Sequence, residues 1–342
     1  MSGVDFTDKF FQQTLAHLSV NDSLFFTPKQ LYYAFNHRRN TKKRHPLQVA
    51  GGCALFALVG LSVILYLANG FSVLWFIPLL LVGGFSLALV SSRDLRKRLA
   101  GVRSQELGTT PDQVDLWYKR WSKINGPDAK LLPAPTSQGK LKPEGFTINP
   151  ELRNYSFDRV VVCEHAEIAQ CLIANNFHFE HNCAVLSLDG YPRDIFSTVM
   201  DMLRGNPSLS VYALHDASVR GVELTHTLRR SGQWFAGSTA TMYDLGLTPR
   251  QLFSRSVFIE KSSPYVQTIP AHVASTLQPE EVRWLEAGNF VALESFTPKM
   301  LLRVAAQGIS KSRDPQATDA LVPVTTEGDG GGFFIYTFDS FG

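Results

Sequence analysis

The chain has 342 residues, of which 44% are hydrophobic, and a formal net charge of +3. The small positive excess comes largely from two short basic clusters, and no interleaved basic and aromatic stripe typical of nucleic-acid-binding surfaces stands out elsewhere. The four cysteines have neither CxxC spacing nor histidines at zinc-ligand intervals, which argues against a zinc site and indicates small core residues in a reduced compartment.

The first 45 residues predict a short helical head. We expect helices at residues 5–18 and 28–39, with Thr27 as the N-cap before Pro28 at the first helical position.

The segment at residues 46–92 contains no Asp, Glu, Lys or Arg. It is long enough for two spans of about 20 residues, which we place at residues 47–67 and 71–90, with Asn69-Gly70 as the turn. Basic residues flank both ends, namely Arg38, Arg39, Lys42, Lys43 and Arg44 before the first span and Arg93, Arg96, Lys97, Arg98 and Arg103 after the second. This pattern predicts a hairpin in the inner membrane with both termini cytoplasmic and the lipid bilayer as a partner. The alternative is a buried helical hairpin of a soluble core; a signal peptide would start earlier and be shorter.

The remainder divides by composition. We expect five regions along the chain: a head at 1–45, the transmembrane hairpin at 46–92, a helical and Pro/Gly-rich linker at 93–154, an α/β domain with C-terminal helices at 155–310, and a polar tail at 311–342. The tail contains two β-like segments separated by a Gly-rich stretch and is either a short hairpin or disordered.

The main domain alternates strand and helix. Short β-branched or apolar runs predict strands at residues 159–163, 184–188 and 209–214. Helical segments are expected after each strand, at residues 166–175, 194–203 and 221–230. The alternation predicts right-handed βαβ units on a parallel sheet flanked by helices.

Acidic residues stand where these strands end. Glu164, Asp189 and Asp216 each follow a predicted strand, and ligands of open parallel sheets bind beyond the carboxyl ends of the strands. Three converging carboxylates would suit Mg²⁺, which prefers hard oxygen ligands. The alternative is that the acids only cap the following helices.

The same residues resemble a known family. The segments Val-Val-Val-Cys-Glu164, Leu-Ser-Leu-Asp189-Gly-Tyr-Pro and Ala-Leu-His-Asp216-Ala-Ser218-Val-Arg-Gly occur in the order seen in the Toprim domain of the DNA topoisomerase VI catalytic subunit and of related bacterial nuclease-like proteins. The downstream Leu-Gly246-Leu-Thr-Pro is similar to an element that follows this domain. The resemblance covers roughly residues 157–310, and it implies a Toprim-like, Rossmann-like parallel sheet whose acids hold Mg²⁺ for phosphodiester chemistry on DNA.

The chain departs from the family at one functional position. The family's Asp-x-Asp is Asp216-Ala217-Ser218 here, and Val219 replaces a proline. A serine hydroxyl is a weaker Mg²⁺ ligand than a carboxylate, although Asp189 could compensate. Two functions therefore stay open: a membrane-anchored, catalytically degenerate module that binds or scaffolds other proteins of a multi-protein system, and a Mg²⁺-dependent DNA nuclease or strand-transferase in which Glu164 and Asp216 are catalytic.

The head contains a second, weaker similarity. The segment around Tyr32-Tyr33 resembles the helix that carries the catalytic tyrosine of the topoisomerase VI family, which would make Tyr33 the nucleophile. An aromatic pair on an amphipathic helix also fits core packing or an anchor beside the bilayer. The histidines, His165 among them, show no zinc-like or triad-like spacing and are expected to be surface or hydrogen-bonded residues.

Overall fold

The computed structural model describes residues 8–40, 103–105, 107–135, 158–204, 206, 208–253, 256–262, 268–312, 321–324 and 333–336. Among these residues, no helix combines the length and the apolar character needed to cross a membrane. The predicted membrane hairpin at residues 46–92 lies outside the described residues, as do residues 93–102, 106 and 136–154 of the predicted linker.

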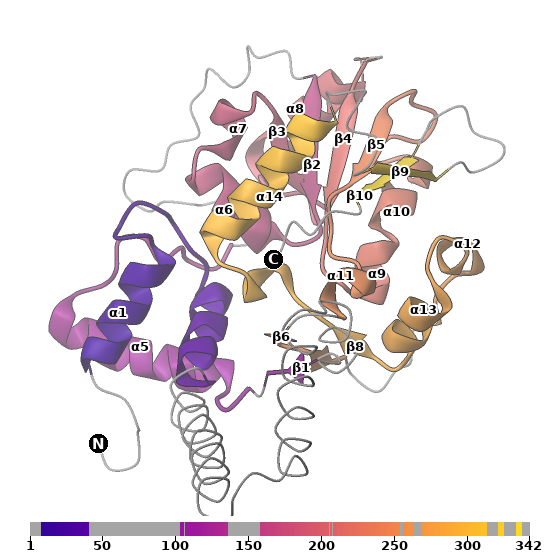
Figure 1. Cartoon of the computed structure of the whole chain (residues 1–342). Helices are drawn as coiled ribbons and strands as arrows, with labels where there is room; N and C mark the ends of the chain where they lie inside the picture. Colours follow the sequence, from indigo (N-terminus) through magenta and orange to yellow (C-terminus); the bar gives the residue numbers. More distant parts are fainter. Residues whose placement is uncertain are drawn as a thin grey trace, which may run out of the picture.

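A parallel sheet forms the centre of the α/β region (Figure 1). Its first four strands along the chain are β2 (Arg159–Cys163), β3 (Ala184–Ser187), β4 (Ser210–Leu214) and β5 (Thr241–Asp244). They are arranged in the order β3-β2-β4-β5, so the second strand lies at one edge and the first next to it. All three pairings among them are parallel. The predicted α/β class and the three predicted parallel strands are confirmed, and β5 is an additional strand.

Two further strands extend this sheet beyond β5. The strand β10 (Phe333–Tyr336) pairs parallel with β5, and β9 (Leu321–Val324) pairs antiparallel with β10. Both β-like segments of the predicted polar tail therefore belong to the sheet, as an antiparallel pair at its edge.

Side chains of β2 alternate between two hydrophobic cores, because successive residues of a strand point to opposite faces. Val161 and Cys163 belong to the core beneath α6 (Ala166–Ala174) and α14 (Pro298–Lys311), whereas Val160 and Val162 belong to the core beneath α8 (Arg193–Arg204) and α10 (Leu224–Arg230). Helices thus cover both faces of the sheet (Figure 1). The carboxyl ends of β2 and β4, which precede Glu164 and Asp216, are packed between these two cores.

The predicted helices of the α/β region form close to their expected bounds. The segment predicted at residues 221–230 is divided into α9 (Val219–Val222) and α10. The other short elements are α7 (Phe177–Glu180), α11 (Pro249–Leu252), α12 (Ala271–Ala274), α13 (Pro279–Glu286), the 3₁₀ helix η3 (Leu293–Ser295), and two small sheets, β1 (Arg103–Ser104) with β6 (Ser256–Val257) and β7 (Glu260–Lys261) with β8 (Asn289–Phe290).

The head packs against the α/β region through an aromatic core. The predicted head consists of α1 (Asp8–Leu18) and a helix at residues 28–40, and α5 (Pro111–Asn125), a helix of the predicted linker, packs into the same core. Within this core the ring of Phe35 contacts the rings of Phe11 and Trp117, at 5.8 Å and 5.4 Å between centroids. The side-chain amide of Gln30 also donates a hydrogen bond to the carbonyl of Phe296, at 3.2 Å. The helix at residues 28–40 therefore lies against the part of the α/β region that leads into α14.

Candidate metal centre

Glu164 and Asp216 meet because their strands are neighbours. Residue Cys163 at the end of β2 pairs with Leu214 at the end of β4, and the amide of Glu164 continues the ladder by donating to the carbonyl of Leu214 at 2.9 Å. The amide of Asp216 then donates to Oε2 of Glu164 at 3.1 Å. The parallel register thus brings both carboxylates to one edge of the sheet, as the strand ends predict.

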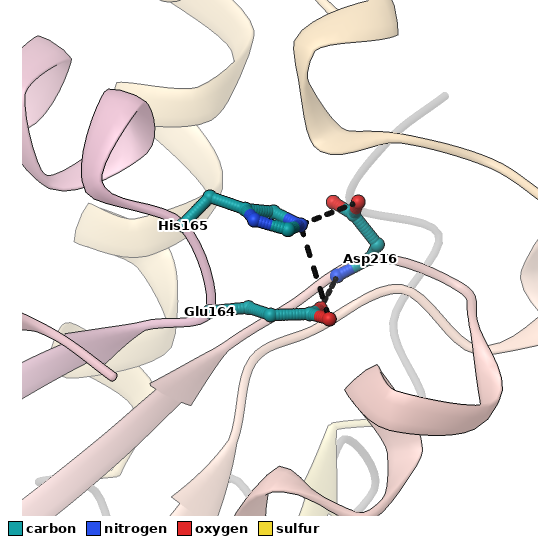
Figure 2. Close-up of side chains that lie close together, drawn as sticks. All are labelled: Glu164, His165 and Asp216. Atoms are coloured by element: carbon teal, nitrogen blue, oxygen red, sulfur yellow. Dashed lines mark hydrogen bonds and ion pairs between the residues drawn. The ribbon is translucent and has the colours of Figure 1, made fainter. Parts of the chain in front are cut away.

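Each carboxylate has one oxygen bound by the backbone and one oxygen directed at His165 (Figure 2). Oδ1 of Asp216 accepts a hydrogen bond from the amide of Leu293 at 2.8 Å. Oδ2 of Asp216 and Oε1 of Glu164 lie 3.2 Å and 3.8 Å from Nε2 of His165. Both carboxylates are buried, at 2% exposure for Glu164 and 4% for Asp216, whereas a third of the His165 side chain is exposed. The imidazole therefore covers a buried pair of acids from the solvent side.

This arrangement makes His165 a cation at neutral pH. Its hydrogen bond to Asp216 raises the pKa of His165 to about 9, and the nearby Glu164 acts in the same direction. Burial, followed by the charge of Asp216, raises the pKa of Glu164 above its ordinary value. At pH 7 a group with a pKa of about 9 is about 1% neutral, so the imidazolium supplies a positive charge to the two carboxylates.

The three side chains could also hold a metal ion. One ligand atom from each of Glu164, His165 and Asp216 lies within 4.8 Å of the others. Two carboxylates and one imidazole form a mixed donor set: carboxylates suit Mg²⁺ and Mn²⁺, while imidazole suits Zn²⁺ and other transition metals. A metal ligand must be deprotonated, so an ion could use His165 only after displacing its proton.

A third buried carboxylate and a lysine lie beside this group. An antiparallel bridge between Ala217 and Val291 brings the segment that includes Leu293 and Glu294 to the site. Glu294 is 2% exposed, and its Oε2 lies 3.6 Å from Nζ of Lys29, on the helix at residues 28–40. Burial raises the pKa of Glu294. Burial by itself would lower the pKa of Lys29, but the charges of Glu294 and Asp216 raise it above its ordinary value. The head thus contributes a positive charge to the acidic site.

A second histidine supports the site from within the core. His215 is completely buried, its Nε2 is 2.9 Å from Oδ1 of Asp244, and its Nδ1 is 2.7 Å from the carbonyl oxygen of Asp216. Burial alone would lower the pKa of His215, but the charge and hydrogen bond of Asp244 raise it to about 9. Protonated His215 therefore donates from both ring nitrogens. It ties the backbone of Asp216 to Asp244 and holds the acid in place.

Two glycines permit this close packing. A Cβ on Gly246 would lie 2.2–2.4 Å from ring atoms of His215, and a Cβ on Gly221 would lie 2.1 Å from the carbonyl oxygen of Asp216. Both distances are shorter than atoms tolerate, so the site requires glycine at each position.

The other residues predicted for the site lie apart from it or have different partners. The hydroxyl of Ser218 accepts a hydrogen bond from the amide of Gly221 at 2.9 Å and caps α9. Asp189 is 57% exposed in its side chain and lies 3.7 Å from Arg220, in a surface pair. Among the His, Cys, Asp and Glu side chains of the described residues, Asp189 does not belong to the group formed by Glu164, His165 and Asp216.

Tyr33 is buried in the aromatic core of the head, at 1% exposure. Its hydroxyl donates a hydrogen bond to the carboxylate of Glu260. Burial, together with that hydrogen bond, raises the pKa of Tyr33 far above its ordinary value. The structure therefore places Tyr33 in a packing and hydrogen-bonding position, with its proton firmly held.

Four further residues of the site carry no sequence pattern that predicts a metal centre: His165, His215, Lys29 and Glu294. For His165 a signal existed, because it directly follows Glu164 at the strand end. Lys29 and Glu294 come from distant segments, and no local pattern connects them to β2 and β4. Comparisons of the sequence with models of known families and with curated proteins give no match.

Proposed function

We propose that this chain is a Toprim-related module, anchored at the cytoplasmic face of the inner membrane, that binds or scaffolds other components of a multi-protein system. Its acidic site is held together by a histidine cation and carries out no phosphodiester chemistry. The observation that carries the proposal is the position of His165, whose Nε2 faces one oxygen of Glu164 and one of Asp216.

The charges at the site support this proposal. In the described residues the site combines three buried carboxylates with two cations: Glu164, Asp216 and Glu294 with His165 and Lys29. The raised pKa values of Glu164 and Glu294 favour a bound proton on these acids and reduce the net negative charge further. Because Mg²⁺ affinity depends on uncompensated negative charge, a site neutralised from within is a weak Mg²⁺ site.

The position of Ser218 points in the same direction. In the related family a carboxylate stands there, whereas here the hydroxyl accepts a hydrogen bond from the helix it caps. The carboxylate that the family has at this position is thus replaced by a neutral hydroxyl, which is already hydrogen-bonded to the amide of Gly221.

Contacts on either side of the predicted hairpin support its topology. The side chain of Arg39 donates to the carbonyl of Gly108 at 3.1 Å, and the hydroxyl of Thr109 donates to Asn36 at 3.0 Å. The chain segments that precede and follow residues 46–92 therefore lie side by side, as a two-span hairpin with both termini on one side requires. The basic flanks assign that side to the cytoplasm.

DNA cleavage is the experiment that tests the proposal. The full-length chain, purified in nanodiscs, should not nick supercoiled DNA with Mg²⁺ or Mn²⁺ between pH 7 and 9. Glu164→Ala and Asp216→Ala are the diagnostic variants, and Asp189→Ala, which removes an exposed acid of a surface pair, is the matched control. Metal-dependent nicking that disappears in both diagnostic variants and persists in the control would refute the degenerate site.

Divalent-metal-dependent cleavage of DNA is the second candidate function. It is favoured by the convergence of Oε1 of Glu164, Oδ2 of Asp216 and Nε2 of His165 within 4.8 Å. These atoms would hold the ion, and a bound divalent cation would stabilise negative charge that develops on a phosphate. The imidazole ligand favours Mn²⁺ or Zn²⁺ over Mg²⁺. Since His165 must first lose its proton, this function predicts activity that increases as the pH approaches 9.

A further inference from the structure

The outward face of α5 combines exposed apolar and basic side chains. Ile124 is 81% exposed and Leu116 46% exposed, and they are two of the three large hydrophobic side chains that the described residues leave exposed. Lys119, Arg120 and Lys123 are also exposed. The three basic residues follow Leu116 by three, four and seven positions, and Ile124 follows it by eight. At this spacing all five side chains lie on one face of the helix.

The opposite face of α5 is fixed in the head core. The ring of Trp121 stacks with Phe11 at 5.7 Å between centroids, and Trp117 packs with Phe35 at 5.4 Å. Val114 is buried in the same core. Because the inward face is fully used by these contacts, the outward apolar residues cannot turn into the protein without breaking them.

The start of α5 lies next to the chain segments that flank the predicted spans. Its N-cap is Thr110, which directly follows the residues that contact Asn36 and Arg39 in the last turns of the helix at residues 28–40. Figure 1 shows α5 crossing the end of the head at which that helix finishes. A bilayer that receives the chain a few residues after residue 40 would therefore lie within reach of α5.

The charge on this face changes along the helix. Asp112 and Asp115 lie in its first half, and Asp115 forms an ion pair with Lys119 at 2.6 Å. From residue 116 onward the exposed charged side chains are all basic. The second half of the helix is thus apolar and cationic, the combination found in helices that lie in a membrane interface.

We propose that residues 116–124 of α5 dock on the anionic cytoplasmic surface of the bilayer. Leu116 and Ile124 enter the headgroup region, and Lys119, Arg120 and Lys123 contact lipid phosphates. This inference rests on the membrane anchorage in the proposed function, and it adds a second membrane contact that orients the α/β domain.

Site-specific fluorescence tests the docking in the full-length chain. An environment-sensitive probe is attached at Leu116→Cys or Ile124→Cys in a parent carrying Cys53→Ser; the cysteines at 163, 171 and 183 are buried. Phe179→Cys on α7 is the matched control, because Phe179 is 47% exposed and α7 lies away from α5 (Figure 1). In nanodiscs with anionic lipid, we expect a blue shift and quenching by nitroxide-labelled lipid at residues 116 and 124, with neither effect at 179.

The basic residues are tested separately. Replacing Arg120 or Lys123 by Gln should each lower the ratio of docked to undocked α5 about fivefold, and zwitterionic nanodiscs should lower it further. The docking alone would be overturned if the chain enters the nanodiscs but the probes at residues 116 and 124 stay in water. It would also be overturned if these probes become buried only after DNA or a protein is added. Failure of the chain to incorporate into nanodiscs would overturn the membrane anchorage and the docking together.

Discussion

Replacement of His165 by alanine tests its role as the cation of the acidic site. The variant removes the group that faces Oδ2 of Asp216 at 3.2 Å and Oε1 of Glu164 at 3.8 Å. The two buried carboxylates then lose their shared counter-charge and repel each other. We expect lower stability, and we expect Mn²⁺ to restore it, because the ion can take the vacated position between the two acids.

The magnitude follows from the pKa of His165. A rise from 6.5 to about 9 corresponds to about 3.4 kcal/mol of preferential stabilisation of the imidazolium in the folded state, at about 1.36 kcal/mol per pKa unit. A third of the side chain is exposed, so solvent screening reduces this to roughly 1–2 kcal/mol. For a chain of 342 residues, that loss lowers the Tm by roughly 1–3 °C.

Thermal unfolding of the purified chain, with and without millimolar Mn²⁺, measures the effect. His178→Ala is the matched control: burial lowers the pKa of His178 to about 4, so that side chain is neutral and its loss removes packing without removing charge. Mn²⁺ should restore the Tm of His165→Ala and leave the control unchanged. An unchanged Tm in His165→Ala, or equal Mn²⁺ effects on both variants, would refute the role assigned to His165.

Three further predictions concern the same site. Ser218→Asp should raise Mn²⁺ affinity in a calorimetric titration without lowering the Tm, because aspartate also caps helices; unchanged affinity would mean that position 218 does not face the site. Gly246→Ala should cost about 1–3 kcal/mol, since its Cβ would lie 2.2 Å from His215, whereas Gly232→Ala, with open space around it, should be neutral; equal costs would contradict the packing described. The stability that protonated His165 and His215 contribute is fully present below pH 6.5 and is lost as the pH rises through about 9. The Tm should therefore fall between pH 6.5 and 9, and a flat profile would show that neither ring is charged.

The strands of the sheet could be predicted because their residues are buried on both faces. The β-branched run of β2 has no polar residue between Val160 and Cys163, and this pattern is typical of a central parallel strand. Strand β5 was not predicted, because its four residues, Thr241–Asp244, are few and lack the run of β-branched residues that marks β2. Its place in the sheet depends on pairing with β4. A segment this short contains no local signal for that pairing.

The candidate site was predictable only in its two strand-end acids. Glu164 and Asp216 could be identified because parallel strands end at one edge of a sheet. The same rule included Asp189, whose side chain instead lies at the surface beside Arg220. The remaining members depend on tertiary packing: the imidazole of His165 turns toward Asp216, and Lys29 arrives on a helix of the head.

The titration of His165 is the most direct test of a site neutralised from within. NMR of the full-length chain with ¹³C-labelled histidine, assigned with a His165→Gln variant, would follow the ring from pH 6 to 10 with and without millimolar Mg²⁺. We predict a pKa of about 9 that Mg²⁺ does not change. A ring that is neutral at pH 7, or one that releases its proton when Mg²⁺ is added, would contradict the proposal and favour a functional metal centre.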